Sequence, residues 1–345
     1  MRMRSVVVFG VLALSVIACG DVDGDEDVAS ESSEISYGDR SSIQLYNANL
    51  KHLSEPGKPT FEGTDYTQLL SFMKKQDTLP DILMLQEIGT KTDRFSSQPC
   101  DAVLAAMDRL VKPSGFRTTW KCIVANGGTG GLSNSPGGVA IIHRARFEPS
   151  GPKRVVGLYR WSKSGCEKQQ AGSGWSALVQ RFDDGKHSLA VASIHLPTAG
   201  TDEGNATGDD CSGKNLALVE DALAATGADV KIMAGDMNHG DATRHLDAKG
   251  AVVHDWWEHT YRSRVAGLSS SSYRDAFFDA CKGSSQCLES EHWTMNNKGA
   301  LDSRIDWVLV AGAKSLTQAK TISYEEVNPA VQYSDHRAQM MKVRY

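Results

Sequence analysis

The chain has 345 residues, of which 40% are hydrophobic and 23% charged, and its formal net charge is −5 at pH 7. Eight acidic residues and no basic one lie between Asp21 and Asp39; outside this stretch and the basic start, the chain carries 35 basic and 34 acidic residues. The folded part is therefore nearly neutral, which excludes binding of a polyanion through net charge alone. A polyanionic substrate stays allowed. About 305 residues without repeats, proline tracts or charged linkers suit one large domain.

The first residues have the pattern of a bacterial export signal. Two arginines precede an apolar run from Val6 to Ala18, which is too short to span a bilayer as a permanent helix. Ala18 directly before Cys19 resembles the lipobox of bacterial lipoproteins, in which the cysteine is acylated and becomes the mature N-terminus. We therefore expect a signal peptide at 1–18 and an exported protein that its lipid anchors to the cell membrane or outer membrane, facing outside the cytoplasm. A cleaved secretory signal and an uncleaved anchor are the alternatives.

Residues 19–40 predict a disordered tether, because their low hydrophobicity and like charge leave little to stabilise an ordered state. The folded domain is expected at 41–345. Six cysteines follow Cys19, and an even number in an exported chain predicts three disulfides rather than a zinc site, for which the CxxC spacing is missing. The short, flexible loop KGSSQ makes Cys281 with Cys287 the first expected pair. The nearest-neighbour choice for the others, among fifteen possible pairings of six cysteines, is Cys100 with Cys122 and Cys166 with Cys211.

Several strand-length runs rich in valine, isoleucine and leucine are bounded by glycine, proline or charged residues, as buried strands usually are. They are IQLYN at 43–47, DILMLQE at 81–87, GGVAIIH at 137–143, SLAVASIH at 188–195, DVKIMAGDMN at 229–238 and SRIDWVLV at 303–310. Between them, helical spacing or caps predict helices at 64–76, 100–112 and 214–227. A hairpin is expected at 175–195, with its turn at Asp184 and Gly185. Strands alternating with helices, together with a hairpin, predict an α/β sandwich with mixed sheets.

Polar residues stand at the ends of these apolar runs. Five of them directly follow a run and one interrupts a run: Asn47, Glu87, His195, Asp236, Asn238 and Asp306. Burying an unpaired carboxylate or imidazole costs several kcal/mol, on the order of a domain's whole stability, so a core would rarely collect so many without a use. Any one of them could be an ordinary strand-end residue, but the set indicates a functional site.

Six segments together resemble the endonuclease/exonuclease/phosphatase superfamily, which includes deoxyribonuclease I-like nucleases, bacterial sphingomyelinases and inositol polyphosphate phosphatases. The segments are LYNANL, DILMLQE, IHLP, GDMN, SRIDWVLV and YSDHRA, in the family's order between residues 43 and 338. One such motif is unspecific, whereas the ordered set is specific. The resemblance implies an α/β fold, a four-layer αββα sandwich of two mixed β-sheets, and a divalent metal ion used to hydrolyse phosphate esters.

By this resemblance Glu87 is the principal metal ligand, with Asn47 close by and Asp335 completing or supporting the ligand set. Oxygen ligands without cysteine indicate Mg²⁺, with Mn²⁺ or Ca²⁺ as alternatives. Ser334 beside Asp335 and His336 does not form a serine-hydrolase triad, because adjacent residues of an extended strand point to opposite faces.

The resemblance also assigns catalytic roles. His336 would take the proton from the attacking water, with Asp306 orienting its ring and stabilising the imidazolium. Asp236 and Asn238 would position the nucleophile and the phosphate. His195 would face the phosphate from the other side, as hydrogen-bond donor or general acid.

This sequence departs from deoxyribonuclease I upstream of the IHLP segment, which contains His195. There a glutamate upstream orients the matching histidine, but the corresponding stretch here, TWKCIVANGG, has no acidic residue, which leaves the protonation state of His195 open. Asn49 shares a strand face with Asn47 and is expected to assist the water at the metal. Arg304 is expected to brace a strand end or a loop rather than to contact phosphate, and His239 is not assigned a role.

The substrate is not named by this common machinery. We expect a monomeric nuclease with nucleic acid as substrate. Basic loop residues could contact the phosphate backbone of that substrate: Arg144, Arg146, Lys153, Arg154 and Arg160. The first alternative is a sphingomyelinase or phospholipase C-like enzyme acting on lipid head groups, for which Trp256 and Trp257 would insert into membranes; their more common role is in a core. An inositol phosphate phosphatase is the next alternative. A non-catalytic surface lipoprotein would be expected to have lost the residue types at Glu87, Asp236 or His336, and none is lost.

Overall fold

A computed structural model of the chain describes the fold over a defined set of residues. These are 41–50, 80–87, 104, 120–125, 138–162, 165–171, 175–197, 208–240, 244–246, 249, 252–295, 304–322 and 336–345. The predicted signal peptide, the tether and the helix at 64–76 lie outside them, as do Ser334 and Asp335. The helix predicted at 100–112 is described at Leu104 alone, which is helical.

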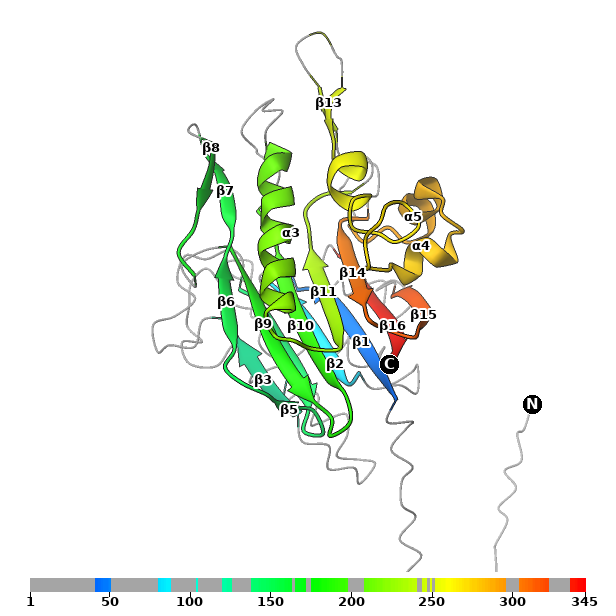
Figure 1. The fold of residues 1–345 in the computed structure, drawn as a ribbon. Coiled ribbons are helices and arrows are strands. Elements are labelled where there is room, and N and C mark those ends of the chain that lie inside the picture. The colour runs from blue at the N-terminus through cyan, green and yellow to red at the C-terminus, as the bar shows by residue number, and fades with distance from the viewer. Residues whose placement is uncertain are drawn as a thin grey trace, which may run out of the picture. The chain divides into compact units, whose positions relative to one another are not determined.

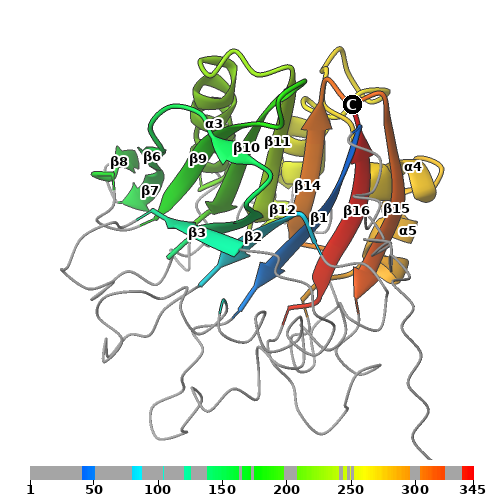
Figure 2. The same cartoon turned by 90° about the horizontal axis from the view of Figure 1, so that it is seen from below.

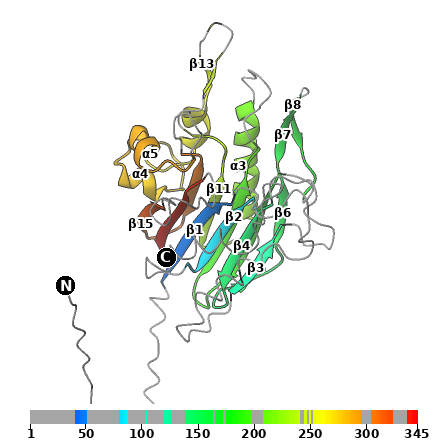
Figure 3. The same ribbon diagram turned by 180° about the vertical axis from the view of Figure 1, so that it is seen from behind.

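The first sheet has the strand order β15, β16, β1, β2, β4, β3. The bounds of these strands are β1 Ser42–Asn49, β2 Ile82–Gln86, β3 Trp120–Val124, β4 Ala140–Arg144, β15 Ser315–Ile322 and β16 Ala338–Arg344. β1 and β2 are parallel and the other neighbours are antiparallel, so the sheet is mixed. Figure 3 shows β1, β2, β4 and β3 side by side.

The second sheet has the order β14, β11, β10, β9, β5, with β6 also pairing with β9. Its strands are β5 Glu148–Pro149, β6 Arg154–Gly157, β9 Ser176–Asp183, β10 Ser188–His195, β11 Val230–Asp236 and β14 Asp306–Ala311. β10 and β11 are parallel, and their other neighbours are antiparallel. The predicted hairpin is confirmed, because β9 and β10 pair antiparallel. At its turn, Asp184 Oδ1 accepts hydrogen bonds from the backbone N–H groups of Lys186 and His187.

The two sheets face each other and enclose the main hydrophobic core (Figure 2). Every residue of β1, β2 and β10 is buried, which explains why these segments are nearly continuous apolar runs. β1 and β2 of the first sheet pack against β10 and β11 of the second. Each fully buried leucine, isoleucine or valine contributes about 1.5–3 kcal/mol relative to exposure. The predicted sandwich of two mixed sheets is confirmed.

Helix α3, Gly208–Ala224, covers the outer face of the second sheet (Figure 1). Leu216, Val219 and Leu223 recur at helical spacing and are buried in the core cluster. The helix predicted at 214–227 is thus confirmed, although α3 begins earlier. The other two predicted helices, at 64–76 and 100–112, fall outside the described ranges apart from Leu104.

Smaller elements connect and flank the sheets. They are the hairpin strands β7 Tyr159–Ser162 and β8 Gly165–Lys168, the hairpin strands β12 Arg244–Leu246 and β13 Val252–Asp255, the π-helix η3 Trp257–Tyr261, and the helices α4 Ala276–Ala280 and α5 Ser285–Glu291. Asp275 caps α4, where its carboxylate accepts from the backbone N–H groups of Phe277 and Phe278. Among the described helices, none has both the length and the apolar character needed to cross a bilayer.

Two of the expected disulfides are present, Cys166–Cys211 and Cys281–Cys287. Cys122 is disulfide-bonded as well, while Cys100, its expected partner, lies outside the described residues. The Cys166–Cys211 bridge joins β8 to α3. Asn215 of α3 supports the same contact, because its side chain exchanges two hydrogen bonds with the backbone of Tyr159 in β7.

Trp256 is a core residue, which is the more common of the two roles considered for it. It is completely buried, its ring lies 4.0 Å from that of Trp307, and its Nε1 donates to Ser212 Oγ at 3.2 Å. Trp257 is half-buried and stacks on Tyr261 at 4.4 Å. The exposed tryptophan pair required by the membrane-insertion alternative is therefore not formed.

Candidate active site

The site residues lie close together because the strand ends that carry them lie at the same end of the sandwich. In the second sheet, His195 at the end of β10 pairs with Asp236 at the end of β11, which pairs with Asp306 at the start of β14. In the first sheet, Glu87 directly follows β2, and His336 lies just before β16. Both sheets thus deliver ionisable side chains to one end of the sandwich.

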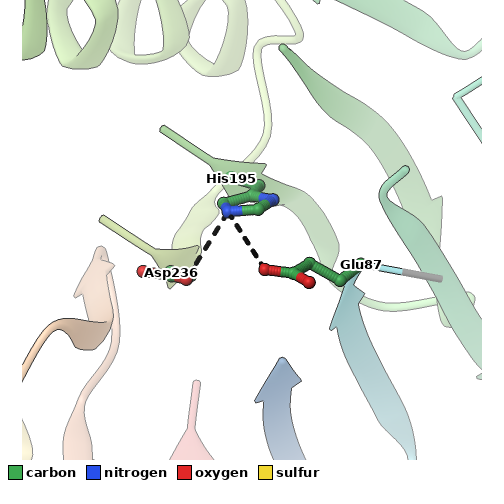
Figure 4. A group of neighbouring side chains, drawn as sticks. All are labelled: Glu87, His195 and Asp236. Atoms are coloured by element: carbon green, nitrogen blue, oxygen red, sulfur yellow. Dashed lines mark ion pairs between the residues drawn. The ribbon is translucent and has the colours of Figure 1, made fainter. Parts of the chain in front are cut away.

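His195 lies between two carboxylates from different sheets (Figure 4). Its Nε2 is 3.7 Å from Glu87 Oε1 and 3.5 Å from Asp236 Oδ2. One ligand atom from each of these three residues lies within 4.8 Å of the other two. The imidazole is almost completely buried, and the Trp175 ring packs edge-on against it at 4.4 Å.

His336 forms a second group with two aspartates. Its Nδ1 lies 2.8 Å from Asp306 Oδ2, within hydrogen-bond distance, and its Nε2 lies 3.7 Å from Asp236 Oδ2. All three side chains are buried. Because Asp306 holds Nδ1, the other ring nitrogen points toward Asp236 and is placed to exchange a proton there.

Asn49 joins the carboxylates of the two sheets. Its Nδ2 donates to Asp236 Oδ2 at 2.7 Å and to Glu87 Oε1 at 3.1 Å. Asn47, two residues earlier on the same face of β1, instead accepts a hydrogen bond from Gln86 Nε2 at 3.0 Å. The asparagine against Glu87 is therefore Asn49, and the metal-ligand role of Asn47 stays a prediction.

Two residues of the site have left-handed backbone conformations. Glu87 has φ 50° and Asn238 has φ 52°, although residues other than glycine rarely adopt positive φ. Asn238 is fixed by a bond from its backbone N–H to Asp236 Oδ1 at 2.7 Å and by a bond from its Nδ2 to the Leu196 carbonyl at 2.7 Å. Such strain persists where surrounding contacts enforce it, which is characteristic of functional sites.

Gly235 of the GDMN segment is required by close packing. It pairs with Ile194 in the parallel β10–β11 ladder, and a Cβ at this position would overlap the Ile194 carbonyl. Only glycine therefore lets β11 approach β10 closely enough to set Asp236 beside His195.

The electrostatics of the site centre on Asp236. Burial raises the pKa of Asp236 to about 7; nearby His336 opposes this shift, and Asp306 adds to it. The described ion pairs of Glu87, Asp236 and Asp306 are with histidines. Asp236 and Asp306 are buried and Glu87 is partly buried, so a bound cation would offset the repulsion among these closely placed carboxylates.

The donor set fits a divalent metal ion. Glu87 and Asp236 offer carboxylate oxygens, which hard cations prefer, beside the imidazole of His195. Asp306 Oδ1 is buried and has no hydrogen-bond partner among the described residues, which adds an acceptor to the same region. The third predicted ligand, Asp335, lies outside the described residues and stays a prediction.

Buried residues behind the site hold it in place. Arg304, as predicted, is a brace: its Nη2 lies 2.7 Å from Asp275 Oδ2, which also accepts from Tyr261 Oη at 2.6 Å. His239 is buried and stacks on Trp256, with ring centroids 5.5 Å apart. These contacts fix the segments that follow Asp236 and precede Asp306.

Two of the basic residues that were expected to contact the phosphate backbone of a nucleic acid lie away from the site. Arg144 and Arg146 pair with Asp81 at 3.5 Å and 2.8 Å, beside the start of β2, whereas Glu87 follows its end. The reason is that β4 runs antiparallel to β2, so its C-terminal residues point away from the site. The prediction is wrong for these two arginines.

No protein-family model matches the sequence, and no curated protein matches it. Solved structures do match. A truncated TDP2 from Caenorhabditis elegans has a TM-score of 0.55 at 18% identity, covering 88% of this chain and 98% of that one. An endonuclease/exonuclease/phosphatase from Bacteroides vulgatus has a TM-score of 0.54 at 13% identity, with coverage of 88% and 98%. The chain has the endonuclease/exonuclease/phosphatase fold.

The human Nocturnin catalytic domain, solved with a bound sulfate anion, has the same fold, with a TM-score of 0.54, 15% identity and coverage of 88% and 93%. In the endonuclease/exonuclease/phosphatase fold of this chain, five of the segments that resembled the superfamily contribute to β1, β2, β10, β11 and β14. The described end of the sixth, residues 336–338, leads into β16. These elements carry the site. The resemblance found in short motifs is thus confirmed in the fold as a whole.

Proposed function

We propose that this protein is a divalent-metal-dependent phosphoester hydrolase that uses an activated water. The observation that carries the proposal is the convergence of Glu87, Asp236 and Asp306 with two histidines at one end of the sandwich. Carboxylates placed to hold a cation, next to a carboxylate–histidine pair placed to move a proton, supply what such hydrolysis needs. The shared fold supports the same reaction class.

Glu87 and Asp236 would hold the ion, with His195 beside them and Asp335 as a predicted further ligand. Mg²⁺ is the proposed ion because the donors are carboxylate oxygens, and Mn²⁺ or Ca²⁺ would suit the same donors. When bound, the ion would draw negative charge from the non-bridging oxygens of the phosphate.

His336 is the proposed general base. The Asp306 carboxylate fixes its Nδ1 at 2.8 Å, so Nε2 is presented to the attacking water and takes its proton. The same carboxylate stabilises the imidazolium that results. Because the pair is buried, it is protected from competing hydrogen bonds with bulk water.

The remaining residues orient the reactants. Asn49 holds Glu87 and Asp236 at a fixed separation through its two hydrogen bonds. Asn238 is held in its left-handed conformation two residues after the end of β11 and is proposed to help position the phosphate. His195 is the proposed donor to the phosphate from the opposite side.

We propose a nucleic acid as the substrate. Danio rerio TDP2, whose structure was solved with a single-stranded DNA product, aligns over 88% of this chain at 15% identity, with a TM-score of 0.54. The near-neutral folded part implies modest, salt-sensitive binding. A lipid-cleaving enzyme loses its main support, because Trp256 is buried in the core.

The proposed location is outside the cytoplasm, with the lipid on Cys19 as the anchor. The disulfides support an oxidising compartment. Replacing Cys19 by serine should release the protein from the membrane fraction, and unchanged fractionation would contradict acylation.

The test of function is a substrate panel. Purified protein is incubated with plasmid DNA, single-stranded DNA, RNA, sphingomyelin and phosphatidylinositol phosphates, each with Mg²⁺, Mn²⁺ or Ca²⁺. We expect nucleic acid to be cleaved, and EDTA to abolish cleavage while circular dichroism stays that of a folded protein. Cleavage of lipid alone would refute the substrate, whereas no cleavage of any substrate, or cleavage in EDTA, would refute the proposed metal-dependent hydrolase.

A further inference from the structure

One group of buried polar side chains lies between the two sheets, next to the ionisable residues of the site. It consists of Asn47 on β1, Gln86 on β2, Ser193 on β10 and Gln339 on β16, which we call the polar layer. All four residues are completely buried, and apolar core residues such as Leu45 and Met341 neighbour them along the strands. Neutral polar side chains in such a place need hydrogen-bond partners.

Only part of this need is met within the polar layer. Gln86 Nε2 donates to Asn47 Oδ1 at 3.0 Å and to Ser193 Oγ at 3.2 Å. Ser193 Oγ in turn donates to the Leu85 carbonyl at 3.0 Å. These bonds link β1 and β2 of the first sheet to β10 of the second.

The other polar atoms of the layer have no protein partner among the described residues. They are Asn47 Nδ2, Gln86 Oε1, and both Oε1 and Nε2 of Gln339. Asn47 and Gln339 are direct neighbours in the β1–β16 register. Turning the Gln339 amide over would exchange its donor and its acceptor, and the crystal structure described below distinguishes a direct bond to Asn47 or Gln86 from bound water.

We propose that the polar layer binds buried water. The four atoms comprise two donor groups and two acceptors, and water is the small ligand that can both accept and donate. The polar layer contains no charged side chain, unlike the neighbouring site with its carboxylates. A neutral ligand is therefore favoured over a metal ion.

Each member of the polar layer lies close in sequence to a site residue. Gln86 directly precedes Glu87, Ser193 is two residues before His195, Asn47 is two residues before Asn49, and Gln339 follows His336 by three residues. Water bound here would therefore lock together the strands that carry the site. Gln86, Ser193 and Gln339 act through their neighbours, so they are positioning residues.

The sharpest test replaces Gln339 by methionine, which has similar length and no strong polar group. If water is bound, Gln339→Met removes its partners and leaves the Asn47 donor poorly satisfied, so the Tm of the metal-free protein falls. If the amide atoms are simply unpaired, removing two of them raises the Tm, and the proposal is overturned. This measurement needs no activity, so its outcome is independent of the proposed function.

Gln44→Met is the matched control. Gln44 is also a buried amide of the first sheet, but its Nε2 already donates to the Met341 carbonyl at 3.2 Å, and it lies an odd number of positions from Asn47 on β1, hence on the other face. A positioning role predicts that Gln339→Met weakens Mn²⁺ binding, measured by calorimetry, by about tenfold, the low end for outer-shell residues. Gln44→Met should leave Mn²⁺ binding unchanged, and equal effects of the two variants would contradict the positioning role.

A high-resolution crystal structure of the unaltered protein provides the direct readout, which also decides the case if Gln339→Met does not fold. We expect ordered water within hydrogen-bond distance of Gln339 and of Asn47 Nδ2. A dry polar layer, or a Gln339 amide bonded directly to protein groups, would overturn the proposal.

Discussion

The two ends of β2 carry carboxylates in opposite electrostatic settings. At its start, Asp81 lies 2.8 Å from Arg146 and 3.5 Å from Arg144, and its Oδ2 accepts from the Gln44 backbone N–H at 2.8 Å. At its end, Glu87 meets His195 and the neutral amide of Asn49. The first carboxylate has two permanent positive charges beside it, whereas the contacts described for the second are to a titratable histidine and an amide dipole.

This difference separates a structural carboxylate from one suited to bind a cation. A carboxylate held by two guanidinium groups is neutralised in the folded protein and contributes to its stability. Carboxylates gathered around histidines repel one another until a cation or a proton arrives. The same strand thus supports the fold at one end and provides the chemistry at the other.

The largest expected effect is on catalysis at the site end. Replacing His336 by alanine removes the proposed base and should lower kcat by about 100-fold or more, the usual range for a lost general base. The measurement is the steady-state rate on the substrate that the panel identifies. A variant with nearly full activity would contradict the assignment, provided that its Tm shows it to be folded.

A pair of neutralising substitutions tests the comparison directly. Glu87→Gln should lower kcat/KM by about 100-fold, because it removes a proposed metal ligand, and should change the Tm of the metal-free protein little. Asp81→Asn should leave kcat/KM within about twofold but lower stability by about 1–3 kcal/mol, because it leaves two partly buried arginines without their carboxylate. Denaturant unfolding and activity assays separate the two outcomes. Equal losses of activity would show that the two ends do not differ as described.

Asp236 should make the metal-free protein less stable as the pH rises. Its folded-state pKa is about 7 against an ordinary value of 3.8, so between these values the folded state binds more protons than the unfolded state. Stability from this group is present below about pH 4 and is lost as the pH rises through 7. The Tm of Asp236→Asn should therefore exceed that of the unaltered protein at pH 7.5, and this difference should be smaller at pH 5. The change in the difference is expected to be a few degrees, which corresponds to about 1 kcal/mol. Saturating Mg²⁺ should reverse the advantage, and a pH-independent difference would contradict this account.

His143, on β4 near the Asp81 end, should give the opposite and smallest pH effect. Burial lowers its pKa below 6.5, which its contact with the Arg144 carbonyl only partly offsets. The unfolded state then binds more protons near pH 6, so stability is lost as the pH falls below about 6.5. His143→Gln should lose less stability than the unaltered protein between pH 7.5 and pH 5, by at most about 1 kcal/mol. Parallel curves in thermal unfolding would refute this prediction.

Much of the fold could be predicted from the sequence because its central strands are buried on both faces. β1, β2, β10 and β11 coincide with apolar runs, and the polar residue that ends each run marked the site. A run that must be buried is visible in one dimension, and so is the ionisable residue that interrupts it.

What could not be predicted depends on strand direction and on contacts between sheets. Arg144 follows an apolar run just as Glu87 does, and the antiparallel pairing of β2 with β4 alone sends it to the opposite end. Asn47 and Asn49 share a strand face, so their spacing did not reveal that Asn49 reaches Asp236 of the other sheet. Gln339 is an uncharged polar residue at the start of β16, and its burial became visible only once β16 was placed beside β1.

The packing of Trp256 against Trp307 also has an optical consequence. Indole rings with centroids 4.0 Å apart and planes tilted by 58° couple their excited states and so produce paired bands of opposite sign in circular dichroism. Trp307 directly follows Asp306, and Trp256 stacks on His239, next to Asn238. The protein therefore carries an intrinsic chromophore pair behind its site, which can report small movements of β14 relative to the segment around Trp256 without a label or a substrate.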